Sequence, residues 1–363
     1  MWVASSEDRA HMQRALRLAE RGLNSTTPNP RVGCVLVSAG GDVLAEGWHK
    51  VAGGGHAEAN ALAAVNTSCE GATAYITLEP CSHYGRTSPC ADALINAGIA
   101  RVVYGMEDPN PKVAGNGLKK LRDAGVEVQG ALFEDQARAL NPGFIKRMET
   151  GLPYVRIKSA MSVDGRTAMA SGESKWITAP AAREDVQRLR ARSCALITGL
   201  GSVVHDDPSL TVRLGENDRQ PLRVIVDTQI RCPAEAQILG KRGRTVIACS
   251  ALATQTESDN RELWRLPERA GRVDLDALLR RLADEGCNEV LVETGAELAG
   301  AFVEQALVDE FVIYIAPKFL GSEARPLFAL PIDTMSGSLP LIIKDVRAVG
   351  YDWRITAIPD PDS

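Results

Sequence analysis

One histidine and two cysteines of this chain have the residue types and order of ligands for a catalytic zinc ion. His56 opens the segment HAEANALAAV, Cys81 follows Pro80 after a strand-like run, and eight residues separate Cys81 from Cys90. One imidazole and two thiolates suit tetrahedral zinc and leave the fourth position for water, which is typical of a catalytic site. Zinc makes that water acidic enough to exist as hydroxide near neutral pH.

Glu58 adds a proton carrier to this group. It stands two residues after His56, and we expect its carboxylate to collect the proton of the water and to deliver it to the departing ammonia. Zinc deaminases share this H-x-E and Pro-Cys chemistry, although their two cysteines are separated by two residues rather than eight. The pattern predicts a hydrolytic deaminase that acts on an amino group of a nitrogen heterocycle.

The same three residue types are also compatible with two rival roles. The histidine and the cysteines could each belong to the core of a domain. A structural zinc site is the stronger rival, but it would normally use four protein ligands, and the nearest additional donors are His49 and His83. We also expect the three proposed ligands to lie at helix starts, where the positive helix ends would favour thiolate over thiol.

A second polar cluster accompanies the proposed metal ligands. Asn29, in the segment TPNPRVG, offers both a donor and an acceptor to the edge of a base, and Arg86 can hold a phosphate. With His49 and His83, they form the predicted substrate contacts of the deaminase. Without a metal centre beside them, the same residues would be read as a polar turn.

The elements that must position these residues alternate between helices and strands. An amphipathic helix (6–22) precedes a hairpin (32–49) with a Gly-Gly-Asp turn, and helices and strands then alternate as far as residue 132. Such a series predicts a three-layered α/β domain. A second α/β series begins near Pro153. The polar stretch 133–153 lies between them, so we place the boundary within residues 146–152 and assign the domains as 1–148 and 149–363.

Composition limits the classes of partner. The chain has 363 residues, a net charge of −5 and 45% hydrophobic residues. These values favour a small-molecule substrate and give no sign of a nucleic-acid-binding surface. The first residues lack the pattern of a signal peptide, and no apolar run approaches the roughly 20 residues of a membrane span. We therefore expect a cytoplasmic enzyme without membrane or nucleic-acid partners. The sequence leaves open whether it forms a homo-oligomer.

Four segments of the first half resemble one known family. TPNPRVG, HAEANAL, LEPCSHYGRTSPC and VYGMEDPNPKVAGNG are similar to the deaminase half of the bifunctional riboflavin-biosynthesis deaminase–reductase family, in which eight residues also separate the cysteines. Only Tyr84 and Ser88 depart from the expected loop. The resemblance implies a cytidine-deaminase-like fold and a diaminopyrimidinone substrate that carries a ribosyl phosphate.

The second half lacks the G-x-G-x-x-G fingerprint of an ordinary dinucleotide-binding domain. Residues 158–176, with the runs GLGSVVHDDPSLTVR and LVETGAELAGAF, resemble the reductase domain of the same family. That resemblance implies a dihydrofolate-reductase-like fold and NADPH as the cofactor, which reduces the ribosyl group to ribityl.

The resemblance also implies individual contacts in the second half. The residues that match the family's cofactor contacts are Ala160, Trp176, Ser202, Asp206 and Thr228, together with the loop of Gly295, Ala296, Glu297, Leu298, Ala299, Gly300 and Ala301. The residues that match its substrate contacts are Ser174, Arg190, Leu210, Arg213 and Glu293. Free N–H groups at the helix start after Gly295 suit a pyrophosphate, and the two arginines suit a ribose phosphate. For Trp176 and Arg190, the residue type alone would favour packing and solvent exposure.

Two rival functions share part of this pattern. A nucleoside or tRNA-base deaminase with an accessory nucleotide-binding domain would use the same zinc chemistry, but it leaves the segment KSAMSVDGRTAMA unexplained. A zinc-stabilised binding protein would have no use for an open ligand position or for Glu58. The bifunctional enzyme accounts for both halves of the chain.

Overall fold

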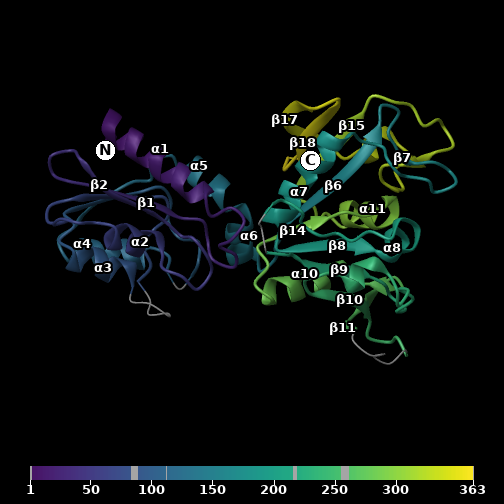
Figure 1. Cartoon of the computed structure of the whole chain (residues 1–363), viewed down its shortest axis with the longest axis horizontal. Helices are drawn as coiled ribbons and strands as arrows, with labels where there is room; N and C mark the ends of the chain where they lie inside the picture. The colour runs from purple at the N-terminus through teal and green to yellow at the C-terminus, as the bar shows by residue number, and fades with distance from the viewer. Residues whose placement is uncertain (1, 83–88, 112, 216–218, 255–260, 363) are drawn as a thin grey trace. The chain divides into compact units, whose positions relative to one another are not determined.

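The computed structural model describes residues 2–82, 89–111, 113–215, 219–254 and 261–362. The chain divides into two compact units, Met1–Gly151 and Leu152–Ser363, whose elements are labelled in Figure 1. Among the helices in these described ranges, none has both the length and the apolar composition needed to cross a membrane.

The first unit contains one sheet and helices on both of its faces. Its elements are α1 (Ser6–Glu20), β1 (Gly33–Val37), β2 (Val43–Trp48), α2 (Ala57–Ala63), β3 (Thr73–Ile76), α3 (Cys90–Asn96), β4 (Arg101–Tyr104), α4 (Asn116–Asp123), β5 (Glu127–Gln129), α5 (Glu134–Leu140) and α6 (Pro142–Thr150). The strand order is β2-β1-β3-β4-β5. Strands β1 and β2 form the predicted antiparallel hairpin, and β3, β4 and β5 run parallel to one another.

Three layers result from this arrangement. Helices α1 and α5 cover one face of the sheet, and α2, α3 and α4 cover the other (Figure 1). Two glycines allow the close contacts that this requires: a Cβ atom at Gly33 would lie 2.0 Å from the Ala15 carbonyl oxygen of α1, and one at Gly47 would lie 2.2 Å from the Ala57 carbonyl oxygen of α2. The predicted three-layered α/β domain is therefore present.

The second unit is built on a larger sheet. Its elements are β6 (Tyr154–Ser162), β7 (Arg166–Ala168), α7 (Pro180–Arg192), β8 (Ala195–Gly199), α8 (Leu200–Asp206), β9 (Leu222–Val226), α9 (Gln237–Gly240), β10 (Thr245–Ser250), β11 (Glu262–Leu266), β12 (Glu268–Arg269), β13 (Arg272–Val273), α10 (Leu275–Asp284), β14 (Glu289–Val292), α11 (Ala296–Glu304), β15 (Glu310–Ala316), β16 (Arg325–Pro326), the 3-10 helix η1 (Met335–Gly337), β17 (Leu341–Val349) and β18 (Asp352–Pro359).

Nine strands form the main sheet in the order β11-β10-β9-β8-β14-β6-β15-β18-β17. In this spatial order, every strand from β11 at the edge through β10, β9, β8, β14 and β6 to β15 runs parallel to its neighbours. Strands β18 and β17 then form an antiparallel edge. Alternate side chains of β8 lie in the hydrophobic cores on opposite faces of the sheet. Ala195 and Ile197 pack with α10 and α11, whereas Leu196 packs with α7 and α8. A parallel sheet that is covered on both faces explains the nearly continuous apolar runs of these strands.

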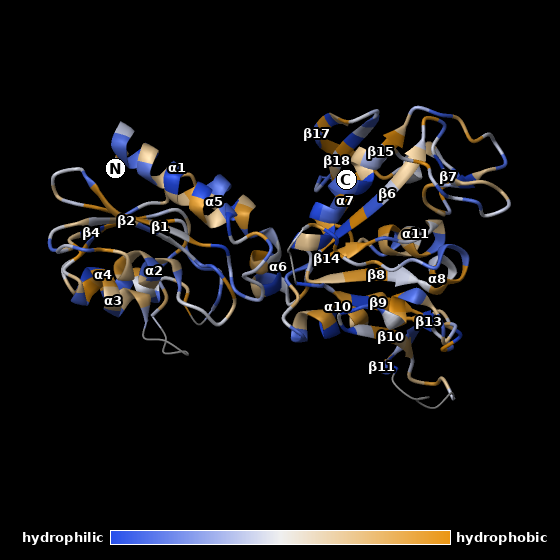
Figure 2. Ribbon diagram, viewed as in Figure 1, coloured by the Kyte–Doolittle hydropathy of each residue, from blue (hydrophilic) through white to orange (hydrophobic). Residues whose placement is uncertain are grey.

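The hydropathy of the helices follows the same rule. Figure 2 shows hydrophobic and hydrophilic residues alternating along α1 and α10, as expected for helices that bury one face. Leu278, Leu279 and Leu282 of α10 are fully buried. The segment that we predicted to be a junction is not a loop, because α5 and α6 occupy most of residues 133–153 within the first unit.

Candidate functional site

Two of the three predicted zinc ligands lie at helix starts. His56 is the N-cap residue of α2 and has an extended backbone, with φ −69° and ψ 169°. Cys90 is the first residue of α3. Cys81 lies in no described helix, and residues 83–88 are outside the described part of the chain, so our expectation of a helix start just after Cys81 stays a prediction. A hydrogen bond of 3.2 Å from the Ala91 N–H to the Cys81 carbonyl oxygen connects this ligand to the start of α3.

The three side chains point at a common centre. His56 Nδ1 lies 3.5 Å from Cys81 Sγ and 3.3 Å from Cys90 Sγ, and the three ligand atoms are within 4.8 Å of one another. Zinc–nitrogen and zinc–sulfur bonds of about 2.1 and 2.3 Å at a tetrahedral angle would separate the two ligand atoms by roughly 3.6 Å. The group therefore fits zinc, and within the described ranges it includes no fourth protein ligand. His83, one of the two additional donors of the rival structural site, lies outside the described residues.

The electrostatics of the two cysteines also suit a divalent cation. A hydrogen bond from the Cys90 thiol, together with bonds from His56 and the Cys90 backbone N–H, lowers the pKa of Cys81 to about 4. The hydrogen bond with Cys81 and burial raise the pKa of Cys90. Two thiolates this close repel each other, and a bound cation allows both to be ionised.

Glu58 lies in the first turn of α2, beside this cluster. Its side chain is only 3% exposed. Burial and the negative charge of Cys81 raise the pKa of Glu58 to about 7, against the opposing effects of His56 and of a hydrogen bond with Cys90. A carboxyl group with a pKa near neutrality can both accept and donate a proton during one reaction cycle.

The predicted substrate contacts Asn29 and His49 are joined to each other. The Asn29 amide lies 3.1 Å from His49 Nε2, and His49 Nδ1 lies 2.9 Å from the Gly55 carbonyl oxygen. Since a carbonyl can only accept, Nδ1 carries the proton and Nε2 accepts from Asn29. Burial lowers the pKa of His49, and its ring contacts that of His56 edge to face. His83 and Arg86, the other two predicted contacts, lie outside the described residues.

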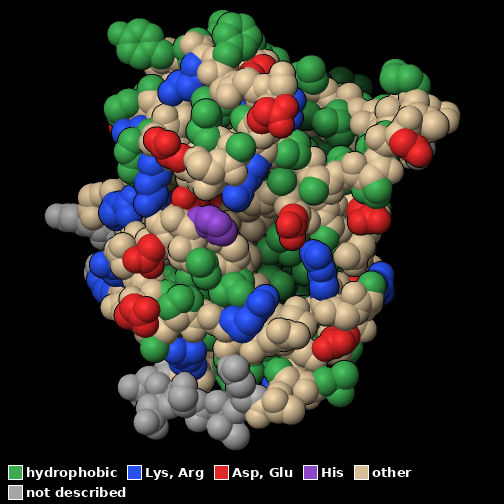
Figure 3. Space-filling view, turned by 90° about the vertical axis from the view of Figure 1, so that its right-hand side faces the viewer, with side chains coloured by type: hydrophobic (Ala, Val, Ile, Leu, Met, Phe, Trp, Pro, Cys, Tyr) green, Lys and Arg blue, Asp and Glu red, His purple; other side chains and the backbone are tan. Residues whose placement is uncertain are grey.

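The second unit contains a wide cleft of about 2410 Å³. It opens at the carboxyl ends of β9, β8, β14 and β6, which is where ligands bind in parallel α/β sheets. Figure 3 shows this face, hollowed beside a histidine side chain, with acidic and basic side chains around the hollow. Its volume exceeds the roughly 300–1,000 Å³ of a single small-molecule pocket, so a cofactor and a substrate can share it.

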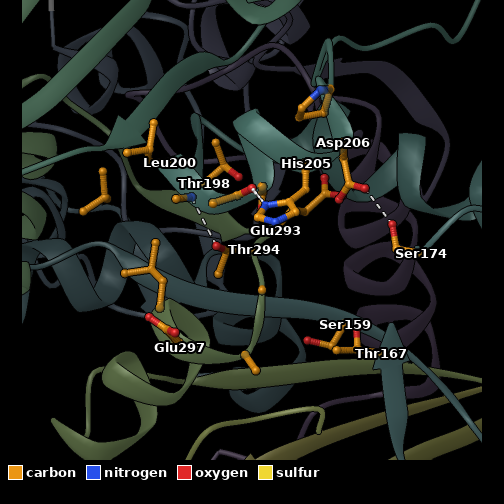
Figure 4. Close-up of a pocket in the computed structure, with 18 of the residues that line it drawn as sticks. Ser159, Thr167, Ser174, Thr198, Leu200, His205, Asp206, Glu293, Thr294 and Glu297 are labelled. Carbon is orange, nitrogen blue, oxygen red and sulfur yellow. Dashed lines mark hydrogen bonds between the residues drawn. The ribbon is translucent and has the colours of Figure 1, made fainter. Parts of the chain in front are cut away.

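Most of the predicted cofactor residues line this cleft. They follow four neighbouring strands: Thr228 after β9, Ser202 and Asp206 in α8 after β8, Gly295 after β14, and Ala160 within β6. Trp176, which also lines the cleft, is 65% exposed, and the Arg183 guanidinium lies over its ring. Figure 4 labels Asp206 together with its neighbour His205 in this cleft.

The predicted loop from Gly295 to Ala301 is mostly helical. Gly295 is the N-cap residue of α11, and the helix begins at Ala296. The cleft is lined by Ala296, Glu297, Leu298 and Ala301. Ala299 is fully buried in the core, and a Cβ atom at Gly300 would lie 2.1 Å from the Ala329 carbonyl oxygen. Ala299 and Gly300 therefore belong to the packed side of the helix.

Two predicted substrate residues, Arg190 and Glu293, bind each other. Arg190 Nε and Nη2 donate to the two carboxylate oxygens of Glu293 at 2.6 and 3.0 Å, and Lys158 Nζ lies 3.9 Å from the same carboxylate. Burial would raise the pKa of Glu293, but the charge and hydrogen bonds of Arg190, aided by Lys158, lower it. This part of the cleft lining therefore consists of charged groups, and Arg190 is already paired with the Glu293 carboxylate.

The remaining predicted substrate residues lie on the cleft walls. Arg213 is exposed, and its guanidinium donates to the Ser209 hydroxyl at 3.0 Å. The Ser174 hydroxyl donates to Asp206 at 2.6 Å, a bond drawn in Figure 4. Leu210 has a positive φ of 44° and is 5% exposed, so it offers the cleft only an edge of its side chain.

Two protein families match separate parts of the chain. The family described as "Cytidine and deoxycytidylate deaminase zinc-binding region" matches residues 5–106, and the "RibD C-terminal domain" matches residues 153–355. The "Riboflavin biosynthesis protein RibD" of Escherichia coli is 48% identical and covers 95% of this chain and 98% of the relative. The protein of the same name from Haemophilus influenzae is 46% identical, with 98% of each chain covered.

Solved structures agree with this result. RibD of Acinetobacter baumannii superposes with a TM-score of 0.91 at 44% identity, covering 98% of this chain and 99% of that one. The chain belongs to the RibD family. A structure from Thermotoga maritima, titled diaminohydroxyphosphoribosylaminopyrimidine deaminase/5-amino-6-(5-phosphoribosylamino)uracil reductase, has a TM-score of 0.89 at 32% identity, with 98% and 99% of the chains covered.

Membership in the RibD family decides between the functions that the sequence left open. The chain is a bifunctional enzyme of riboflavin biosynthesis, with a zinc-dependent cytidine-deaminase-like domain followed by the dihydrofolate-reductase-like RibD reductase domain. The predicted fold class and the predicted pair of activities are confirmed. A nucleoside or tRNA-base deaminase is not favoured, because the RibD reductase match covers the half of the chain that this alternative leaves unexplained.

Sequence reasoning missed two charged residues beside the RibD sites. Lys158 stands at the start of a segment that matches the family but was not assigned a contact, yet it reaches the Arg190–Glu293 pair. Glu79 was not singled out at all, although it is 3% exposed and directly precedes Pro80 and Cys81. A glutamate directly after the apolar run that contains β3 was the available signal, since such a side chain, if buried, needs hydrogen-bond partners.

Proposed function

We propose that residues 1–148 deaminate 2,5-diamino-6-ribosylamino-4(3H)-pyrimidinone 5′-phosphate and that residues 149–363 reduce the ribosyl group of the product to ribityl with NADPH. One observation carries this proposal: the chain contains both kinds of site. The first unit has a His56–Cys81–Cys90 cluster next to a buried Glu58, and the second has a cleft whose lining includes the Arg190–Glu293 ion pair. The name of the Thermotoga maritima relative gives both activities in the same order.

In the deaminase, His56, Cys81 and Cys90 would hold the zinc ion. Bound zinc supplies an acidified water that attacks the ring carbon bearing the amino group. Glu58 would carry one proton of that water to the leaving nitrogen, and the other proton would pass to the adjacent ring nitrogen, so that water and the amino compound become the oxo compound and ammonia. Asn29 faces the base with an orientation fixed by its hydrogen bond to His49.

In the reductase, the cofactor would lie across the ends of β9, β8, β14 and β6. These four adjacent strands span about 14 Å, with about 4.8 Å between neighbours. NADPH supplies the hydride for C1 of the sugar. The N–H groups at the start of α11 suit its pyrophosphate. Arg213 suits the substrate phosphate, and the Arg190–Glu293 pair with Lys158 forms the polar surface that positions the sugar.

Mass spectrometry of the product tests both assignments. The diaminopyrimidinone ribosyl phosphate is incubated with zinc-loaded protein, with and without NADPH. We expect the amino group to become oxo without NADPH, and the product to gain two hydrogens when NADPH is present. An unchanged substrate under both conditions would refute the substrate assignment while leaving the family untouched.

We also infer that the enzyme forms a homodimer through β17. This strand lies at the edge of the nine-stranded sheet, so one side of its backbone has no neighbouring strand within the described sheet. Large apolar side chains gather on it and on its neighbours: Ile343 is 60% exposed, Val346 50% and Trp353 53%. A long apolar edge of this kind pairs with another chain unless it is protected. A second copy offers a matching strand by two-fold symmetry.

The mass in solution tests this dimer. Light scattering after size-exclusion chromatography should give twice 38.9 kDa, and Ile343→Lys should shift the mass towards a single chain. Leu252→Lys, at a 76% exposed position outside this edge, is the control and should leave the mass unchanged. A mass of 38.9 kDa for the unaltered protein at micromolar concentration would refute the dimer.

We place the enzyme in the cytoplasm, where reducing conditions preserve thiolate ligands.

A further inference from the structure

Glu79 is a buried carboxylate that the proposed deamination does not use. It lies between the end of β3 and Pro80, and its side chain is only 3% exposed. Its own backbone N–H donates to the Met106 carbonyl oxygen at 2.9 Å, which fixes it beside the end of β4. A buried carboxylate is costly unless it is fully hydrogen-bonded, so its partners indicate what it does.

Four backbone N–H groups converge on this carboxylate. Oε2 accepts from Asp108 at 3.1 Å and from Gly115 at 2.9 Å. Oε1 accepts from Gly117 at 2.9 Å and from Leu118 at 3.3 Å. Bonds from neutral donors to a charged acceptor are roughly twice as strong as bonds between neutral groups. Glu79 therefore holds both ends of the segment 108–118.

The same bonds cap helix α4. The N-cap residue of α4 is Gly115, which provides no side-chain cap, and the first N–H groups of a helix have no partner within it. Glu79 supplies the missing acceptor from 36 or more residues earlier in the chain. Its negative charge also lies at the positive end of the helix.

Gly117, in the first turn of α4, is packed tightly against the residue that precedes the zinc ligand. A Cβ atom at Gly117 would lie 1.9 Å from the Pro80 carbonyl oxygen, so only glycine permits this contact. On its other side, Cys81 is held by α3, because the Ala91 N–H donates to its carbonyl oxygen at 3.2 Å and the Cys90 N–H donates to its Sγ at 3.4 Å. Cys81 thus lies between two helix N-termini, and Glu79 ties one of them in place.

We propose that Glu79 is a positioning residue of the deaminase, which fixes Cys81 relative to His56 and Cys90 by capping α4 and holding Gly117 against Pro80. This role rests on the proposed zinc site. Because each oxygen accepts two N–H groups, a glutamine cannot replace the glutamate: in either orientation its amide nitrogen, which is a donor, would face two donors. The clamp requires a carboxylate, not merely a side chain of this size.

The first measurement is the zinc dissociation constant of Glu79→Gln in the full chain, obtained by competition with a chromophoric chelator. We expect it to rise by about tenfold or more, as is usual when support for a metal ligand is lost, and the deaminase kcat to fall with little change in KM. Glu127→Gln, at the exposed first residue of β5, is the matched control and should change neither value. The far-ultraviolet circular dichroism and the cooperative thermal unfolding of the same preparation report that the first unit, which carries the substitution, is folded.

Gly117→Ala is a second test that leaves the carboxylate intact. Its added methyl group displaces segment 108–118 from Pro80, so the zinc dissociation constant should rise as it does for Glu79→Gln. This variant also decides the matter if Glu79→Gln does not accumulate as a folded protein. Unchanged zinc affinity in the folded variants would overturn the proposal, even if their thermal stability fell, because a purely structural role would lower stability alone. Zinc affinity needs no substrate, so an error in the substrate assignment would not disturb this result.

Discussion

Burial determines the chemistry available to Glu58. Its carboxyl group is buried beside the thiols of the metal cluster, and burial together with the negative charge of Cys81 raises its pKa to about 7. A glutamate in water would be almost fully ionised at neutral pH and would return a proton poorly. The site therefore contains a group whose proton affinity suits both halves of a proton transfer.

Replacing Glu58 should separate proton transfer from metal binding. Glu58→Gln keeps the size of the side chain and removes its ability to carry a proton, so we expect the zinc content to stay the same and the deaminase kcat to fall by about 10²–10⁴-fold. Ammonia release and metal analysis of the same sample measure the two effects. Deamination at the unaltered rate would rule out the proton shuttle, and loss of zinc would show that Glu58 supports the metal instead.

At the same scale, the sequence predicts residue types better than residue pairs. The zinc ligands and Glu58 were recognisable because the chemistry requires these types in this order within 35 residues. Arg190 and Glu293 are 103 positions apart, and no local pattern shows that they form an ion pair. The partners of Glu79 come 29 to 39 residues later, so its role appears only when the chain is folded.

At the scale of elements, periodicity predicted most helices and strands of both units. Helix α1 and the β1–β2 hairpin have strong local patterns. The hairpin of β17 and β18 was missed because β17 is exposed on both sides and shows no alternation of apolar and polar residues. Its stability depends on pairing with β15, which no local pattern encodes.

The contact between β2 and α2 leads to a prediction for an element. A Cβ atom at Gly47 would lie 2.2 Å from the Ala57 carbonyl oxygen and 2.4 Å from the Ala61 backbone nitrogen, so Gly47→Ala must push α2 away from the sheet. Because α2 carries both His56 and Glu58, we expect the first unit to lose about 1–3 kcal/mol of stability and the zinc affinity to fall as well. Thermal unfolding and chelator competition measure these changes.

The matched control for Gly47→Ala is Gly40→Ala in the turn before β2. The nearest atom to a Cβ at Gly40 is the Ser38 hydroxyl at 3.6 Å, an ordinary contact. This variant should unfold at the temperature of the unaltered protein and should bind zinc as tightly. Equal behaviour of the two variants would show that α2 can shift without cost and that the close approach does not position the metal ligands.

At the scale of the whole molecule, each unit has its own sheet, its own core and its own set of reacting groups. The metal ligands come from the first unit alone, and the lining of the cleft comes from the second. Removing one activity should therefore leave the other intact. A chelator should abolish deamination, because without zinc the water loses its activation, while reduction of the deaminated substrate continues at its normal rate.

Arg213→Ala should produce the reverse result. This exposed arginine is expected to bind the substrate phosphate in the cleft, so its loss should raise the reductase KM by roughly tenfold, which corresponds to one charge-assisted contact. Deamination should be unchanged, since no predicted contact of the first unit involves this residue. The two activities are measured separately, each with its own purified substrate. If the chelator or Arg213→Ala lowered both activities together, the sites would be energetically coupled, and the two units would no longer qualify as independent catalysts.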